Sequence, residues 1–297
     1  MAKIVAITTD FGNTPSPLAA QHVRYYAPEV DRYIFVLHDG ATAADDYREQ
    51  LAEAASSNVV VVHKSDLPPF SGDGPNPFDE TKDHYEEEAL KRFQVDGDAF
   101  VLHLDLDEFH VYPVPLRELV RTMEGKSKPA LLGYFRDRLK LNHDCTRVLL
   151  EPVDPRSDLG TQFPWSATYA RDMIEPAPCE EKIMIARRLV GLGHGRHHIR
   201  GANGSRDDGA TSAAKCWSNL NSDWGGDHFY VHHFRWTTHT LNTLSKVLDS
   251  PQDYDPTYVQ EVEGLKLLRC ENDTLLFNRD VRCRCHTGGL PCSGLSY

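Results

Sequence analysis

The sequence lacks any long run of apolar residues. None of its apolar stretches reaches the ~20 residues that a helix needs to cross a bilayer, and the opening Met-Ala-Lys-Ile-Val-Ala-Ile is a short strand-like run rather than a signal peptide. We therefore expect a soluble, cytoplasmic protein without a transmembrane segment. The chain shows no internal repeat and no convincing linker, and its 297 residues can bury a full core.

Positive charge is also scarce. The chain has 32 Lys and Arg against 44 Asp and Glu, which gives a formal net charge of -12. A protein whose main partner is nucleic acid needs a basic face for the phosphates, so this balance argues against nucleic acid. A bound divalent metal is one way for such an acidic protein to accept an anionic nucleotide.

Cysteines are few and scattered. Their number, seven, is odd, and a chain of this length with so few does not predict a disulfide framework. Four possible zinc ligands lie close together in the C-terminal tail, namely Cys283, Cys285, His286 and Cys292. Their spacing matches no common zinc finger, so a frayed or partly oxidised tail is the favoured interpretation.

The most informative stretch runs from Phe100 to Phe109, where an apolar segment ends in Asp105 and Asp107. A buried parallel strand has such a near-continuous apolar sequence, and in an open α/β sheet the ligand crevice lies outside the carboxyl ends of the strands. Mg²⁺ and Mn²⁺ prefer oxygen ligands and often bind one or two carboxylates together with substrate phosphates. The stretch predicts a divalent-metal site for a phosphorylated substrate; a strand-end turn with solvated acids is the alternative.

Three enzyme classes carry similar acidic motifs. HAD-type phosphatases need Thr or Val where this chain has Phe109, and Y-family polymerases carry their motif near the N-terminus with a Ser-x-Asp-Glu that is absent here. Glycosyltransferases of the GT-A fold place D-x-D about 100 residues into the chain, after a nucleotide-binding half. The position of Asp105 and Asp107 fits this third class.

Alternating strand and helix signals surround the motif. Strands are expected at 3–9, 33–37, 59–62, 100–104, 130–135 and 229–234, with a strand beginning at 182, and helices at 18–26, 43–55, 79–94, 116–123, 237–248 and 255–268. The strand–helix–strand order of the first hundred residues predicts parallel βαβ units with right-handed crossovers.

The order of these pieces resembles family-2-type glycosyltransferases with the GT-A fold, in the subgroup with D-x-D-E-F. The resemblance covers roughly residues 3–246, and its most specific parts are Leu104-Asp-Leu-Asp-Glu-Phe109, Gly133-Tyr-Phe-Arg-Asp137-Arg138, Gln162-Phe-Pro164, Lys182-Ile-Met-Ile-Ala-Arg187, Gly193-His194 with His197-His198, and His232-His233-Phe234-Arg-Trp236. The implied fold is α/β: a Rossmann-like, mixed, mostly parallel sheet flanked by helices, in a single large domain.

The implied domain covers residues 1–250, with a nucleotide-sugar half at 1–110 and an acceptor half at 111–250. A C-terminal helix and the Cys-rich tail would occupy 251–297. Acceptor specificity is expected in the loop-rich segments 145–165 and 201–226.

The resemblance also implies site residues. Asp105 and Asp107 would hold Mn²⁺ or Mg²⁺ on the two phosphates of a UDP- or GDP-type sugar, with Glu108 beside them or facing the sugar. The nucleotide would contact Asp105 and the residues that end the first two predicted strands, namely Thr8, Thr9, Asp10 and Asp39. Arg138, which follows the fifth predicted strand, would be a further contact.

Two further roles complete the predicted site. His233 is the candidate C-terminal metal ligand, with His232 as its rival because alternate strand residues face opposite sides. Asp137 is the candidate general base for the acceptor hydroxyl, with Asp144 and Glu151 as weaker alternatives. A structural ion pair between Asp137 and Arg138 is the competing interpretation of that pair.

The sequence therefore predicts a metal-dependent glycosyltransferase that moves a sugar from a nucleoside-diphosphate donor to a glycan, lipid or protein hydroxyl, with inversion favoured by the resemblance. A nucleotidyltransferase on a similar fold is one alternative, although Thr8 to Asn13 lacks the basic residue such enzymes usually carry. An inactive glycan-binding or scaffold protein is the other.

Overall fold

The computed structural model describes the core of the chain in detail. The described residues are 2–10, 16–37, 49, 54, 57–72, 77–143, 147–154, 156–167, 181–193, 196, 199, 229–235, 237, 247, 249–253, 259, 269–270 and 274–276. The predicted helices at 43–55, 237–248 and 255–268, the loop at 201–226 and the Cys-rich tail lie wholly or largely outside these residues.

Four parallel strands form the first part of the sheet. They are β1 (Ile4–Asp10), β2 (Arg32–Leu37), β3 (Val59–His63) and β4 (Phe100–Leu104), in the order β3-β2-β1-β4. β1 lies between β2 and β4 and pairs in parallel with both. Every residue of β1 is buried, as expected for a strand covered on both faces. The parallel strands that the sequence predicts are thus present.

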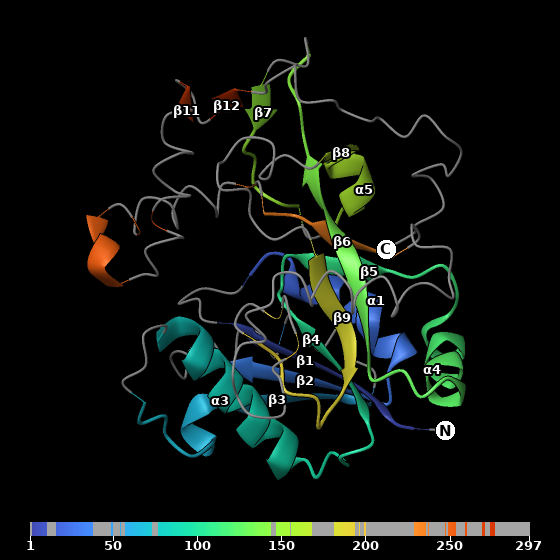
Figure 1. Cartoon of the computed structure of the whole chain (residues 1–297). Helices are drawn as coiled ribbons and strands as arrows, with labels where there is room; N and C mark the ends of the chain where they lie inside the picture. Colours follow the sequence, from blue (N-terminus) through green and yellow to red (C-terminus); the bar gives the residue numbers. More distant parts are fainter. Residues whose placement is uncertain are drawn as a thin grey trace. The chain divides into compact units, whose positions relative to one another are not determined.

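The sheet continues with strands from later in the chain. Its full order is β3-β2-β1-β4-β9-β6-β10-β5, with β8 on the side of β6, nine strands in all among the described residues. The added strands are β5 (Glu108–Val111), β6 (Ala130–Leu139), β8 (Trp165–Ala167), β9 (Glu181–Arg187) and β10 (Tyr230–His233). β9 pairs antiparallel with β4 and β6. The mixed α/β sheet confirms the predicted fold class (Figure 1).

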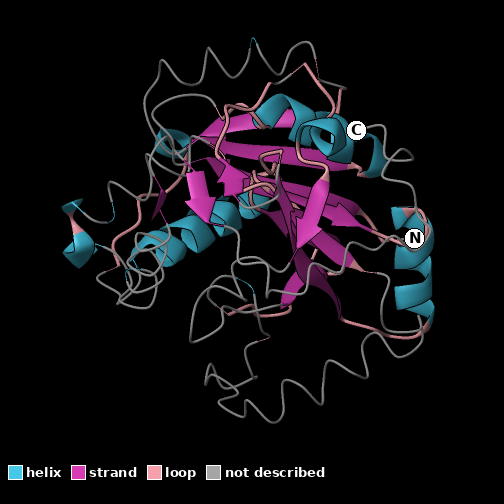
Figure 2. Ribbon diagram, turned by 90° about the horizontal axis from the view of Figure 1, so that it is seen from above, coloured by secondary structure: helices cyan, strands magenta, loops and turns pink. Residues whose placement is uncertain are grey.

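Helices cover both faces of the parallel strands (Figure 2). α3 (Pro77–Arg92) contributes Tyr85, Ala89 and Leu90 to a core with alternate residues of β1 and β2, such as Val5 and Ile34. α1 (Ala19–Tyr26) lies on the opposite face, where its His22 contacts Tyr33 of β2. Because side chains of a strand alternate between the faces, the two helices bury opposite sets of strand residues.

The remaining elements are short. They are α4 (Leu116–Gly125), α5 (Leu159–Gln162), the 3₁₀ turns η1 (Ala27–Glu29), η2 (Lys64–Asp66) and η5 (Pro251–Asp253), and a small antiparallel sheet of β7 (Arg147–Leu149), β12 (Thr274–Leu276) and β11 (Arg269–Cys270). Among the described residues, no helix is long and apolar enough to cross a membrane.

The backbone contacts divide the chain into two compact units. Unit 1 comprises residues 1–134 and 181–231, and unit 2 comprises residues 135–180 and 232–297. Unit 1 contains β1 to β5 and the helices α1, α3 and α4. The boundaries predicted from the sequence, at residues 110 and 250, stay predictions.

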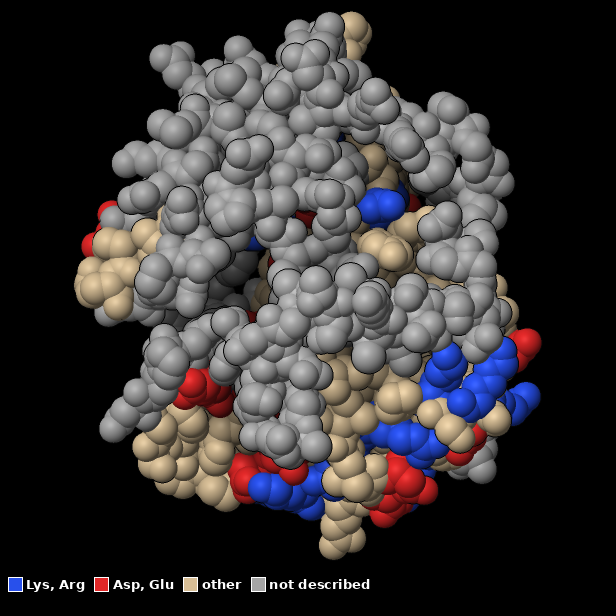
Figure 3. Space-filling view, in the orientation of Figure 1, with Lys and Arg blue, Asp and Glu red and all other residues tan. Residues whose placement is uncertain are grey.

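Charged side chains of both signs lie side by side on the described part of the face in view (Figure 3). Among the described charges, Lys91 pairs with Glu88 and Arg188 pairs with Glu87. Ion pairs at the surface add little to stability. The charges that matter for a site are instead the buried ones, which gather at the ends of β1 and β4.

Candidate functional site

The ends of β1 and β4 lie together because the two strands pair in parallel, with Thr8 opposite Leu104. The predicted nucleotide-contacting residues of β1 therefore reach the same sheet edge as Asp105. Thr8 Oγ1 donates a hydrogen bond to the Leu104 carbonyl at 3.0 Å, and Thr9 Oγ1 donates to Glu86 Oε1 at 3.0 Å. Both hydroxyl groups therefore form hydrogen bonds at this edge of the sheet. Asp10 is buried at the end of β1, and Asp39 lies outside the described residues.

A tight turn follows β4 and carries the two aspartates. The Glu108 N–H donates to the Asp105 carbonyl at 3.0 Å, and the chain re-enters the sheet as β5, a strand that the sequence analysis did not predict. The Glu108 carbonyl accepts from Tyr26 Oη and from His22 Nε2, both at 3.2 Å. Two buried side chains of α1 therefore fix the backbone of the turn.

The His22 imidazole has a defined proton position. A carbonyl can only accept, so Nε2 carries the proton toward Glu108 and Nδ1 accepts from the Tyr33 hydroxyl at 2.6 Å. Complete burial lowers the pKa of His22 to about 3, which keeps the ring neutral. The turn is supported by a neutral hydrogen-bonded chain rather than by an ion pair.

Two buried lysines converge on the first aspartate. Lys82 of α3 ion-pairs with Asp105 Oδ1, and Lys182 of β9 ion-pairs with Asp105 Oδ2. Lys182 also donates to Glu108 Oε1 at 2.5 Å. Burial lowers the pKa of both lysines, that of Lys82 to about 7, where Arg196 also acts in the same direction. Both oxygens of the Asp105 carboxylate thus have a cationic partner.

A second buried ion pair lies behind the lysines. Glu86 of α3 binds Arg196 Nη2 at 2.6 Å and His103 Nδ1 at 2.8 Å. Burial alone would raise the pKa of Glu86, but Arg196 and the hydrogen bond from His103 outweigh burial and lower the pKa to about 2. Arg196 has a positive φ of 60°, a strained backbone for a non-glycine residue. The pair with Glu86 holds this residue against α3.

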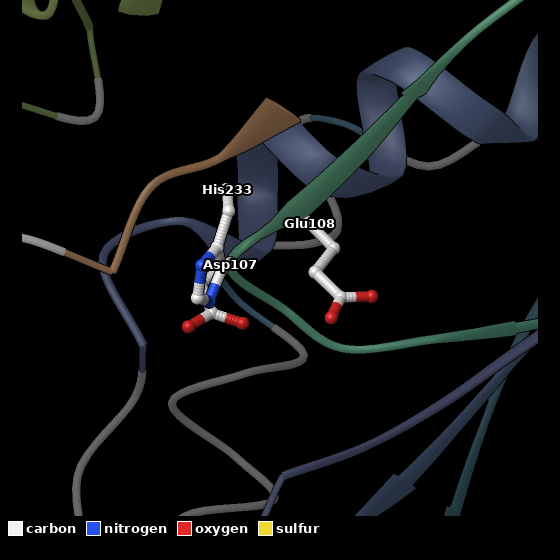
Figure 4. Close-up of side chains that lie close together, drawn as sticks. All are labelled: Asp107, Glu108 and His233. Carbon is white, nitrogen blue, oxygen red and sulfur yellow. The ribbon is translucent and has the colours of Figure 1, made fainter. Parts of the chain in front are cut away.

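The second aspartate lies next to Glu108 in unit 1. Asp107 and Glu108 stand where β5 begins, and the predicted metal ligand His233 ends β10 and belongs to unit 2 (Figure 4). Carboxylate oxygens are the ligands that Mg²⁺ and Mn²⁺ prefer.

The Glu108 carboxylate already has a cationic partner. Lys182 donates to Oε1, and the same ammonium forms an ion pair with Oε2. Glu108 is therefore neutralised within the fold, as Asp105 is.

The two adjacent histidines of β10 have different surroundings. His233 Nδ1 lies 2.9 Å from Asp137 Oδ1. His232 is buried, and burial, with Arg138 and Arg136 nearby, lowers its pKa to about 3. Arg138 donates Nε and Nη2 to the Phe163 carbonyl at 3.0 and 2.8 Å. The predicted candidates Asp137 and His233 thus contact each other, and Arg138 has a backbone partner.

Several residues of the site were missed from the sequence. Lys182 was noted only as the start of a recognisable strand, and Lys82, Glu86 and Arg196 were given no role. The available signal was a lysine beginning the apolar run Ile183 to Ala186, because a lysine in a buried strand needs a carboxylate partner. The partners themselves come from α3 and the β4–β5 turn, far away in the sequence.

Comparisons with known proteins give no family. No family model matches the chain. No curated protein matches it. The chain is similar in structure to S. aureus TarS 1–349, with 14% identity over 48% of this chain and 36% of that chain and a TM-score of 0.28. The structure of TarS 1–349 in complex with UDP-GlcNAc shows 15% identity over 48% of this chain and 35% of that chain, with a TM-score of 0.28.

Two other solved structures match this chain over a larger share of their own length. A 4-diphosphocytidyl-2C-methyl-D-erythritol synthase shows 15% identity over 54% of this chain and 70% of that chain, with a TM-score of 0.28. A mycobacterial protein shows 14% identity over 78% of this chain and 65% of that chain, with a TM-score of 0.33. The chain spans about a third of the TarS 1–349 length. Likenesses this remote carry no activity across, so the function is argued from the site itself.

Proposed function

We propose that the protein is a metal-dependent transferase that uses a nucleoside-diphosphate sugar and passes the sugar to a hydroxyl. The observation that supports this proposal is the acidic turn after β4, where Asp105 and Asp107 follow a buried strand at the same sheet edge as Asp10 of β1. The resemblance to family-2-type glycosyltransferases supplies the reaction class.

The metal would be Mn²⁺ or Mg²⁺. When bound, such an ion supplies Lewis-acid stabilisation of the negative charge that develops on the departing nucleoside diphosphate. Asp107 and the predicted ligand His233 would hold it. We propose that Asp105 instead anchors the turn, since both of its oxygens already pair with Lys82 and Lys182.

The nucleoside would lie over the ends of β1 and β2. Asp10, buried at the end of β1, and Asp39, after β2, are the predicted contacts for ribose or base. A carboxylate accepts hydrogen bonds from ribose hydroxyls or from an imide N–H, which suits UDP or GDP. The acceptor, whether glycan, lipid or protein, and inversion at the sugar carbon belong to the proposal through the resemblance alone.

Thermal unfolding with nucleotides tests the donor site. We would measure the unfolding temperature with UDP, GDP or CMP, each with Mn²⁺ and with EDTA, for wild type, Asp107→Asn and Asp98→Asn. Asp98 is an exposed carboxylate just before the opposite end of β4, so its variant is the matched control. A ligand at ~100 times its Kd stabilises the fold by ~2.7 kcal/mol.

The expected result is a shift with one nucleotide that requires Mn²⁺, persists in Asp98→Asn and disappears in Asp107→Asn. Wild type that shifts with no nucleotide under any condition would contradict the donor site and favour the scaffold alternative. A metal-independent shift retained in Asp107→Asn would contradict the metal ligands.

A further inference from the structure

His63 is the last residue of β3, and its side chain caps the turn that follows. Its Nδ1 accepts the backbone N–H of Ser65 at 3.1 Å and lies 2.6 Å from Ser65 Oγ, which makes His63 the N-cap of η2. A backbone N–H only donates, so the lone pair is on Nδ1 and the single ring proton is on Nε2. The cap thus fixes a neutral imidazole with an N–H donor at its far end.

This Nε2–H donor has no hydrogen-bond acceptor among the residues that the structure describes. The atom itself is buried, although His63 as a whole is half-buried, so bulk water does not supply the missing acceptor. A buried donor without a partner costs stability, and in a native structure such a group needs an explanation. A ligand that brings an acceptor to the end of β3 would satisfy it.

The strand register places His63 in line with a predicted nucleoside contact. Leu37 of β2 is the register partner of both Asp10 on β1 and His63 on β3, and the three parallel strands are neighbours within unit 1 (Figure 1). Residues in register on neighbouring strands share a face of the sheet, so Asp10 and His63 leave the same face at the carboxyl ends. Two strand spacings of ~4.8 Å separate their backbones, a span that one nucleobase can bridge.

We propose that His63 is a specificity-determining residue of the donor site, whose Nε2–H donates a hydrogen bond to a carbonyl oxygen of the donor's base. The inference rests on the proposed function, because it concerns the nucleoside of the same donor. Ligands of open α/β sheets bind outside the carboxyl ends of the strands, and His63 lies at that edge. The cap on η2 supplies the orientation, and the free N–H supplies the recognition.

The base that fits carries a carbonyl beside a ring N–H, as uracil and guanine do. His63 donates to the carbonyl, and the Asp10 carboxylate accepts from the ring N–H. Cytosine and adenine present an amino group in place of that carbonyl, so two donors would face each other. A site built to hydrogen-bond one group rejects the analogue that lacks it, because a buried polar group is left unpaired. The site therefore selects uridine or guanosine diphosphate sugars.

The first test is the ¹⁵N NMR signature of the His63 ring. In the free protein we expect the proton on Nε2. Addition of UDP or GDP with Mg²⁺ should move the Nε2 and Hε2 resonances of His63 in the direction of a new hydrogen bond. A free protein whose His63 ring is protonated on Nδ1 would overturn the inference, and this outcome needs no variant.

The second test is base selectivity, measured as Kd by titration calorimetry with the pairs UDP and CDP, and GDP and ADP, each with Mg²⁺. Wild type should prefer the carbonyl-bearing member of the pair that binds. His63→Asn keeps a good N-cap but removes the donor at the Nε2 position, so it should keep the wild-type unfolding temperature and lose roughly 3- to 10-fold of the preference, the worth of one hydrogen bond.

Two further variants separate recognition from capping. His63→Gln carries an N–H group near the Nε2 position and caps poorly, so it should keep more of the preference than His63→Asn while unfolding at a lower temperature. His84→Asn is the matched control, since His84 Nε2 already has the Pro68 carbonyl as a partner at 2.8 Å, and its selectivity should equal that of wild type.

The outcomes distinguish this inference from the proposed function. Wild type that binds a nucleotide while His63→Asn shows the same base preference overturns only the role of His63, and so does wild type that binds CDP as well as UDP or ADP as well as GDP. Wild type that binds none of the four nucleotides overturns the proposed function and the base contact together.

Discussion

Lys182 Nζ donates a hydrogen bond to Glu108 Oε1 at 2.5 Å, and both side chains are buried. The same ammonium pairs with Asp105, so one lysine of β9 neutralises two carboxylates of the β4–β5 turn. Breaking a buried ion pair by removing one partner typically costs 3–5 kcal/mol, because the other charge is left buried and unpaired. The turn that carries the acidic motif therefore depends on Lys182.

The variant Lys182→Met tests this dependence. We expect the free energy of unfolding, from urea denaturation, to fall by ~3–5 kcal/mol. Lys91→Met is the control, since Lys91 is an exposed lysine that pairs with Glu88 on α3, and it should leave stability nearly unchanged. Equal losses in the two variants would show that Lys182 is not an anchor of the turn.

The buried Glu86 predicts a dependence of stability on acid pH. Its pKa falls from the ordinary 4.5 to about 2 in the folded protein. A depressed carboxyl pKa contributes stability above the unfolded pKa, and that contribution is lost as the pH falls from 4.5 toward 2. At ~1.4 kcal/mol per pH unit, the contribution is on the order of 3 kcal/mol.

The variant Glu86→Gln should therefore be less stable than wild type at pH 7. The difference between the two should shrink as the pH is lowered through this window, because wild type loses the charge that the variant already lacks. Urea denaturation at several pH values measures both curves, with Glu118→Gln on the exposed face of α4 as control. A difference that stays constant between pH 5 and pH 2.5 would contradict the ion pair with Arg196.

Gly133 is required by close packing between neighbouring strands. A Cβ at this position would lie 2.3 Å from Met184 Sδ and 3.3 Å from the Phe229 carbonyl oxygen. We expect Gly133→Ala to lower the free energy of unfolding by ~1–3 kcal/mol, the usual cost of overpacking. Adding Met184→Ala to Gly133→Ala should recover part of that loss, because the nearest clash is with that side chain.

The control for Gly133 is Gly125→Ala on α4. A Cβ there would meet nothing within 4 Å, and alanine favours a helix by up to ~1 kcal/mol relative to glycine, so stability should stay equal or rise. Urea denaturation measures all four proteins. Gly133→Ala as stable as wild type would show that β6 and β9 can separate without cost.

Much of the fold could be predicted because the strands are apolar by sequence. Four valines begin β3, and the apolar run predicted as a strand at 100–104 is β4 with the same ends. α3 was predicted at 79–94 and is observed at Pro77–Arg92. Two differences have a physical reason. β5 begins at Glu108, an acid that is buried only because Lys182 pairs with it, and β6 extends to Leu139 through charged residues.

The site was predictable only in part. Asp107 and His233 were predicted as ligands of one metal, and this stays a prediction. Asp105 was predicted as a metal ligand from local sequence alone, and its lysine partners could not be read there because they lie 23 residues before it and 77 residues after it. Pairing of buried charges is a tertiary property, so the sequence shows the charges but not their partners.

Product analysis tests the central proposal most directly. The protein would be incubated with UDP- and GDP-sugars and Mn²⁺, and separately with nucleoside triphosphates and sugar phosphates. We expect release of nucleoside diphosphate from one nucleotide sugar, dependent on Mn²⁺, lost in Asp107→Asn and retained in Asp98→Asn. Release of pyrophosphate from a triphosphate, with every nucleotide sugar left intact, would contradict the account and identify a nucleotidyltransferase.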